Sequence, residues 1–171
     1  MRLTNIKDGA PATATGLMLP ADVAVSSALG VTHAHSRKRR ASGGGSEAVM
    51  PSNEETVRDF ISAWSRLDAE ELASYFADDG VYHNLPLAAV IGKARIRAFI
   101  AAFIKQWTAT DWEILNIVSA GDIVIAERVD RTRLGDKAVD LPCCGVFEMH
   151  EGKIQIWRDY FDMATYTMAA A

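Results

Sequence analysis

The C-terminal part of the chain contains four strand-like segments joined by very short turns, and this pattern constrains the fold more than any other. The segments cover residues 112–120, 123–134, 139–150 and 153–162, and they are rich in Ile, Val and aromatic side chains in alternation with polar ones. Such alternation predicts β-strands with one buried face. The turns, at Gly121-Asp122, Gly135-Asp136 and Glu151-Gly152, favour antiparallel hairpins. The sequence therefore predicts an antiparallel meander.

Helical patterns precede these strands. Ser52 and Glu55 have the spacing of a capping box, and apolar residues at helical spacing follow: Val57, Phe60, Ile61, Trp64 and Leu67. Asp68 and Glu71 open a second, shorter helix; a short strand is expected at 81–85 and a third helix at about 93–107. Helices followed by a strand meander predict an α+β fold, in which helices cover one face of a curved, mainly antiparallel sheet and leave a deep pocket for a small ligand.

The first fifty residues differ from the rest. They lack strand or helix periodicity and contain a basic run at 37–40 and a Gly-Ser stretch at 42–46. We expect residues 1–50 to be a disordered N-terminal extension, residues 51–165 to form the α+β domain, and residues 166–171 to be a C-terminal tail. We therefore hypothesise that the functional domain starts near Met50.

Composition narrows the function classes. The chain of 171 residues has a net charge of −4, so no global charge attracts nucleic acid, and no apolar run is long enough to span a membrane. Cys143 and Cys144 are adjacent and unsuited to a mutual disulfide, which favours a cytoplasmic location. The four histidines lack metal-ligand spacing. We therefore expect no metal site, no nucleic-acid partner and no membrane partner.

Three charged residues lie on strand faces that are otherwise apolar. Period two puts Arg128 and Asp130 on one face of their strand, and Asp159 on the same face as Trp157 and Phe161 of another. Two aspartates and an arginine brought together in an apolar cup would make a general acid/base site.

Further side chains are expected to face the same cup. Tyr82 and Asn84 share one face of the short strand. The apolar walls are predicted to be substrate-binding residues, which are Phe103, Trp107, Leu141, Cys143, Trp157 and Phe161.

Each polar residue also has a structural interpretation. Arg128 and Asp130 are compatible with a plain ion pair, and Asp159 with a surface pair to a neighbouring arginine. Tyr82 is compatible with a core tyrosine, and Asn84 with the start of a turn before Leu85.

Several segments together resemble the limonene-1,2-epoxide hydrolase family. They are Tyr82-His83-Asn84-Leu85-Pro86-Leu87, Glu127-Arg128-Val129-Asp130, Gly145-Val146-Phe147, Glu151-Gly152-Lys153-Ile154 and Trp157-Arg158-Asp159-Tyr160-Phe161-Asp162. The resemblance covers about residues 52–163 and lies in the order and character of all these pieces.

The resemblance implies both a fold and a reaction. The fold is cystatin-like, as in nuclear-transport-factor-2-like proteins, and members are typically homodimers that use no cofactor. The implied reaction adds water to a small cyclic or lipophilic epoxide in one step to give a vicinal diol. Carried over by motif, the catalytic residues are Asp159 as base, Asp130 as acid and Arg128 between them, with Tyr82 and Asn84 holding the water.

The sequence departs from the family pattern and leaves alternatives open. The N-terminal extension is long, the hairpin loop after Arg133 is short, and Cys143 stands where a larger aliphatic residue is expected. The alternative functions are a ketosteroid-isomerase-like enzyme and a non-catalytic small-ligand-binding or dimerisation module of the same fold. A cation two residues before an aspartate argues against the isomerase, because it favours the ionised carboxylate.

Overall fold

The computed structural model of the chain describes residues 50–85 and 87–170. The expected disordered extension, residues 1–50, lies outside the described residues except for Met50. Its disorder therefore stays a prediction.

The helices form where the capping and apolar patterns predict them. They are α1 (Asn53–Ala63), α2 (Ala69–Ser74) and α3 (Lys93–Phe103), with 3-10 turns η1 (Trp64–Arg66) and η2 (Ile104–Gln106) continuing the first and the third. The capping box is present: the Ser52 side chain accepts from the backbone N–H of Glu55, and the Glu55 carboxylate accepts from that of Ser52. The Asp68 side chain caps α2 by accepting from the backbone N–H groups of Glu70 and Glu71.

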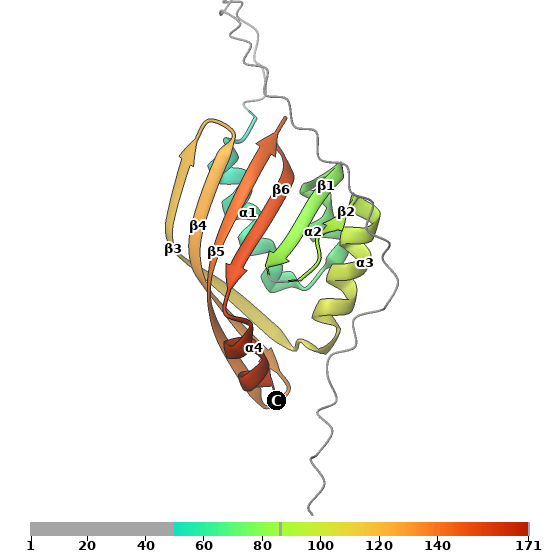
Figure 1. Cartoon of the computed structure of the whole chain (residues 1–171), viewed down its shortest axis with the longest axis vertical. Coiled ribbons are helices and arrows are strands. Elements are labelled where there is room, and N and C mark those ends of the chain that lie inside the picture. Colours follow the sequence, from blue (N-terminus) through green and yellow to red (C-terminus); the bar gives the residue numbers. More distant parts are fainter. Residues whose placement is uncertain (1–49, 86, 171) are drawn as a thin grey trace, which may run out of the picture. The chain divides into compact units, whose positions relative to one another are not determined.

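Six strands form one sheet. They are β1 (Phe76–Leu85), β2 (Val90–Ile91), β3 (Ala109–Ala120), β4 (Ile123–Leu134), β5 (Lys137–His150) and β6 (Lys153–Phe161), in the spatial order β2-β1-β6-β5-β4-β3. The four C-terminal strands pair as antiparallel neighbours, which confirms the predicted meander. Strand β1 lies beside β6 and runs parallel to it (Figure 1).

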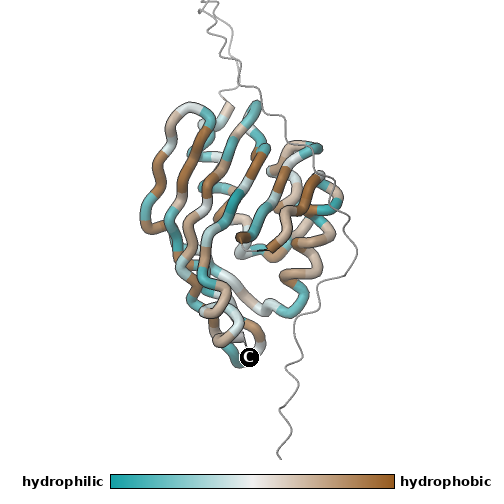
Figure 2. The backbone as a smooth tube through the Cα atoms, in the orientation of Figure 1, coloured by the Kyte–Doolittle hydropathy of each residue, from teal (hydrophilic) through white to brown (hydrophobic). Residues whose placement is uncertain are grey.

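One face of the sheet, here called the inner face, packs against the helices. Helix α1 contributes Val57, Phe60 and Ile61 to a core that also includes Val124 and Ala126 of β4. Hydrophobic and hydrophilic residues follow one another along the strands (Figure 2). This alternation places apolar residues in the core and leaves the opposite, outer face partly exposed.

The short strand begins earlier than predicted. Strand β1 starts at Phe76 rather than at residue 81, so Asp79 and Gly80, residue types that favour turns, lie inside a strand. The cause is pairing with β6, because Phe76 is in register with Ile154 and the register shifts before Val81. The two-residue strand β2, which pairs with Val81 and Tyr82, was not predicted.

A fourth helix occupies most of the expected tail. Helix α4 (Met163–Ala170) follows β6, and Asp162 accepts hydrogen bonds from the Ala164 amide at 3.0 Å and the Thr165 hydroxyl at 2.9 Å. Tyr166 of this helix packs against a small cluster formed by Val139, Leu141 and Cys143. Within the described part of the chain, no helix has the length and apolar character needed to cross a membrane.

Candidate active site

The inner face of β4 changes from apolar to charged along its length. Val124 and Ala126 pack in the core, and the next inward positions are Arg128, with no exposed surface, and Asp130, which is 6% exposed. Two strands away on β6, Asp159 is 4% exposed. Strand β5 lies between them and contributes Cys143, which is in register with Arg128. The alternation therefore brings the two aspartates to one buried region.

Arg128 joins the two aspartates. Its Nε donates to Oδ1 of Asp130 at 2.8 Å, while its Nη2 donates to Oδ2 of Asp130 at 3.2 Å and to Oδ2 of Asp159 at 2.6 Å. The Arg128–Asp130 ion pair of the structural interpretation is thus present, but it is part of a larger group. These charge-assisted bonds fix the positions of both carboxylates.

The electrostatics of the group favour a proton on Asp130. Burial raises the pKa of Asp130 to about 6, against the opposing effect of Arg128 and with a further rise from the charge of Asp159. Burial works against the charge on Arg128, yet Asp130 and Asp159 hold the pKa of that guanidinium well above its ordinary value. One proton on the two carboxylates makes the group electrically neutral, which suits its burial.

Tyr82 and Asn84 reach the group from β1. The parallel pairing with β6 puts Tyr82 in register with Trp157 and Asn84 in register with Asp159. Burial, followed by the charge of Asp159, raises the pKa of the Tyr82 hydroxyl well above its ordinary value, so Tyr82 is neutral. The carboxylate oxygen Oδ1 of Asp159 and the amide oxygen Oδ1 of Asn84 are buried acceptors without a partner among the described residues.

Five of the six predicted wall residues fall into two groups. Leu141, Cys143 and Phe161 belong to the small cluster beneath α4. Phe103 ends α3 and Trp107 follows η2, with ring centroids 4.8 Å apart; Phe103 also stacks on Tyr166 at 6.1 Å.

Trp157 has no exposed surface. Its ring stacks on that of Tyr82 at 4.3 Å. Direct contact of all six predicted wall residues with a substrate stays a prediction.

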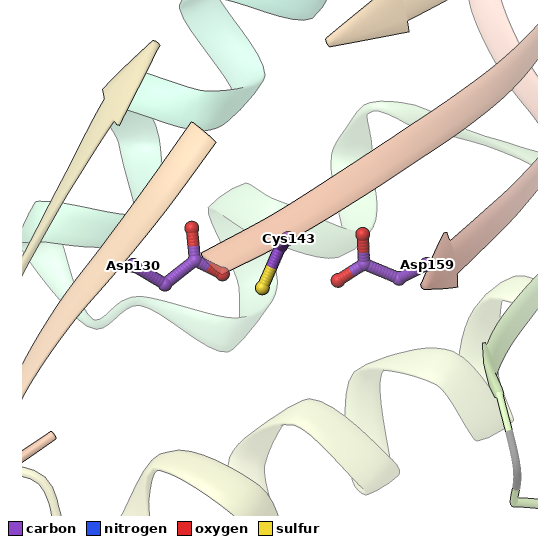
Figure 3. Close-up of side chains that lie close together, drawn as sticks. All are labelled: Asp130, Cys143 and Asp159. Carbon is purple, nitrogen blue, oxygen red and sulfur yellow. The ribbon is translucent and has the colours of Figure 1, made fainter. Parts of the chain in front are cut away.

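Cys143 lies between the two aspartates (Figure 3). One donor atom each of Asp130, Cys143 and Asp159 lies within 4.8 Å of the others. Burial, reinforced by the charge of Asp130, raises the pKa of the Cys143 thiol far above its ordinary value, so it stays protonated. A cation, Arg128, already bonds both carboxylates, and this donor set therefore fits an arginine-centred acid/base group better than a metal centre.

The site itself is closely packed. A cavity of about 270 Å³ is lined by Leu115, Glu127, Arg128, Pro142, Cys143, Cys144 and Tyr160. Another of about 200 Å³ lies where α1 meets β3. Neither is lined by Asp130 or Asp159, whose small exposed fractions leave little of either carboxylate open.

Two aromatic neighbours of the site were not singled out from the sequence. Trp112 of β3 is in register with Asp130, and Tyr166 of α4 packs beside Cys143. Alternation along β3 places Thr110, Trp112 and Ile114 on the inner face, so the sequence pattern could have pointed to Trp112. The position of Tyr166 depends on α4, a helix that the sequence did not predict.

Comparisons with known proteins give a consistent result. Residues 51–171 match the limonene-1,2-epoxide hydrolase catalytic domain family. Epoxide hydrolase EphG of Mycobacterium tuberculosis (strain ATCC 25618 / H37Rv) is 31% identical over 107 residues, which are 63% of this chain and 71% of that protein.

Solved structures extend the comparison. The structure of an M. tuberculosis LEH-like epoxide hydrolase has a TM-score of 0.61 and 28% identity, covering 68% of this chain and 87% of the other. A Catenulispora acidiphila protein with a ketosteroid isomerase-like fold, solved with trimethylamine, has a TM-score of 0.62 and 21% identity over 67% and 91% of the two chains. This second likeness supports the α+β nuclear-transport-factor-2-like fold alone.

Proposed function

The chain belongs to the limonene-1,2-epoxide hydrolase family, and we propose that it adds water to a small cyclic or lipophilic epoxide to give a vicinal diol in one step. The observation that carries the proposal is the bridge from Arg128 to two buried carboxylates. Epoxide opening needs a base for the water and an acid for the departing oxygen, and two carboxyl groups that share one proton supply both.

Asp130 is the acid of this proposal. A pKa of about 6 leaves about a tenth of Asp130 protonated at pH 7, roughly a hundredfold more than an ordinary aspartate. Its proton passes to the epoxide oxygen as the carbon–oxygen bond of the ring breaks. Arg128 stabilises the carboxylate that remains.

Asp159 is the base, and it acts on a water held with Asn84. The two buried oxygens without a partner, on Asp159 and Asn84, are both acceptors. A water that donates one proton to each directs a lone pair away from them and toward a ring carbon. As the new carbon–oxygen bond forms, Asp159 takes the proton. Its return to Asp130 restores the starting state.

The proposed mechanism needs no cofactor, and the substrate is proposed by class. Leu141, Cys143 and Phe161 form an apolar cluster next to the carboxylates, which suits a lipophilic ring or chain. We propose a panel of limonene oxide, an aromatic epoxide and a long-chain epoxide, analysed by chiral chromatography. A simple β,γ-unsaturated ketone in the same panel separates isomerase activity from hydrolysis.

The matched variants Asp159→Asn and Asp140→Asn test the roles. Asp159→Asn removes the base, and we expect diol formation to fall by about 10²–10⁴-fold. Asp140 is exposed on β5, so Asp140→Asn should retain wild-type turnover. Wild-type turnover by Asp159→Asn, with folding unchanged by circular dichroism, would end the proposal.

We also propose that the protein is a homodimer formed through the outer face of the sheet. Apolar side chains are exposed on this face: Val118 is 62% exposed, its partner Ile125 37%, and Tyr160 47%. Light scattering after size exclusion should give twice the chain mass. Val118→Lys should shift the mass toward the monomer, whereas Met168→Lys, on α4, should not.

A further inference from the structure

Arg128 uses only part of its guanidinium for the aspartates. Nε and Nη2 make the three bonds to the carboxylates. Nη1 is buried and has no hydrogen-bond partner among the described residues. A buried donor without a partner costs free energy and favours any rotation that would satisfy it. Hydrogen bonds hold the Nε and Nη2 side of the guanidinium, so the Nη1 side must be held by other contacts.

Two tryptophan rings lie close to the guanidinium. Its central carbon lies 4.7 Å from the ring centroid of Trp112 and 5.5 Å from that of Trp157. Both distances are within the range of cation–π attraction, for which tryptophan is the best partner. The rings therefore favour the charged guanidinium in the place where it is found.

Trp112 is itself held on two sides. Its ring stacks on Trp64 with centroids 4.2 Å apart and an interplanar angle of 17°. Its Nε1 donates to the Thr110 hydroxyl at 3.0 Å, which in turn lies 2.9 Å from the Thr132 hydroxyl. These contacts fix the plane of the ring that Arg128 meets.

Gly145 provides the space for the guanidinium. A Cβ at this position would lie 2.7 Å from Nη1 of Arg128, 2.8 Å from the Phe147 ring and 3.0 Å from Nε1 of Trp157. Its backbone has no positive φ, so the requirement for glycine comes from space rather than from conformation. Gly145 is also in register with Asp159. A methyl group here would press on the arginine that bridges the carboxylates.

We propose that Trp112 and Gly145 are positioning residues, which together with Trp157 hold Arg128 where it bonds both aspartates. This inference rests on the proposed function for its catalytic meaning. Neither Trp112 nor Gly145 contacts the reacting atoms in this proposal. Both residues act by positioning the Arg128 guanidinium. Displacing a catalytic array by about 1 Å costs on the order of 10²-fold in rate.

The kinetic test uses Trp112→Leu, Trp112→Phe and Gly145→Ala, with Leu72→Ala as the control. Leu72 is buried in α2, so its truncation lowers stability without reaching Arg128. We expect Trp112→Leu and Gly145→Ala to lower kcat about 10²-fold with KM little changed. Trp112→Phe retains an aromatic face and should recover part of the loss. The control should retain wild-type kcat per folded molecule.

A titration separates this inference from the proposed reaction. The titratable groups around Asp130 are Arg128, Cys143, Asp159 and Tyr82. Because Arg128 lowers the pKa of Asp130, a displaced guanidinium should raise it, and the carboxyl ¹³C resonance of Asp130 should titrate at higher pH in Trp112→Leu and Gly145→Ala. This readout holds whether or not the wild-type protein hydrolyses an epoxide. An unchanged titration, or a wild-type kcat in both variants, would overturn the proposal.

Discussion

At the residue scale, the most unusual feature is an arginine with no exposed surface. Removing a guanidinium from water costs several kcal/mol, and apolar replacements of buried ion pairs are often neutral or stabilising. Arg128 is nonetheless placed in the core of the sheet, between two carboxylates and two tryptophan rings. A group of this cost is better explained by chemistry than by stability.

The pH dependence of the reaction follows from Asp130. The acid must carry its proton, and the pKa of Asp130 is raised to about 6. We therefore expect kcat/KM to decline above about pH 6, approaching tenfold per pH unit. Initial rates over a pH series check this. A kcat/KM that rises steadily between about pH 6 and pH 9 would contradict the assignment of Asp130 as acid.

The same pKa predicts how stability depends on pH. A carboxyl group whose pKa is raised from 3.8 to about 6 contributes stability below about pH 4, and this contribution is lost as the pH rises through about 6. The loss is about 3 kcal/mol. The Asp130→Asn variant has no titrating group at this position. The difference in free energy of unfolding between wild type and variant should therefore fall by this amount as the pH rises. Urea unfolding of both proteins at about pH 4 and pH 7 measures it, and a constant difference would refute the prediction.

The face of the sheet on which a residue lies could be predicted where strand alternation alone determines it. Arg128, Asp130 and Asp159 were assigned to inward faces from alternation, and all three are buried together. The role of Gly145 was not visible, because the space around it depends on the Arg128 and Trp157 side chains from other strands. The inward face of Trp112 could be predicted, but its register with Asp130 depends on the irregularity between Ile114 and Asn116, which alternation does not reveal.

At the scale of elements, local signals predicted the hairpins and the capped helices but not the long-range pairing. Strand β1 pairs in parallel with β6, which follows about 75 residues later, and this pairing draws Asp79 and Gly80 into the strand. The preference of Asp79 and Gly80 for a turn is weak compared with the backbone hydrogen bonds of the β1–β6 pairing. The parallel pairing brings Asn84 to Asp159, so part of the site depends on a contact that sequence spacing does not encode.

Helix α4 should contribute to stability. Deleting residues 163–171 uncovers the cluster of Val139, Leu141 and Cys143, against which Tyr166 packs. We expect the Tm to fall by roughly 5–10 °C because apolar area is exposed. Met168→Ala, at a position 79% exposed, is the control and should leave the Tm unchanged. A deletion with the wild-type Tm would show that α4 does not stabilise the sheet.

At the scale of the whole molecule, the order of helices and strands predicted the fold class correctly. Helices preceding a four-strand meander leave few alternatives to an α+β sheet with one covered face. Figure 1 shows this arrangement, with α4 added at the C-terminal end. How closely the side chains pack around the carboxylates was not predictable, because it depends on residues from β1, β4, β5 and β6 together.

The described domain is expected to carry the activity alone. Its first structural feature is the capping box at Ser52, which precedes α1. A chain that begins at Met50 should therefore match the full-length protein in kcat/KM and in its far-ultraviolet circular dichroism per folded residue. Loss of diol formation by this shorter chain, when it is folded, would assign a functional role to residues 1–49.

The source of the oxygen in the diol tests the central claim most directly. In single-turnover hydrolysis in heavy-oxygen water, direct attack by a water held at Asp159 predicts one labelled oxygen in the diol and none in the protein. Peptide mass spectrometry of the segments that contain Asp130 and Asp159 completes the measurement. Label in either carboxylate, with unlabelled diol from the first turnover, would mean that a covalent ester forms, and it would contradict the one-step mechanism.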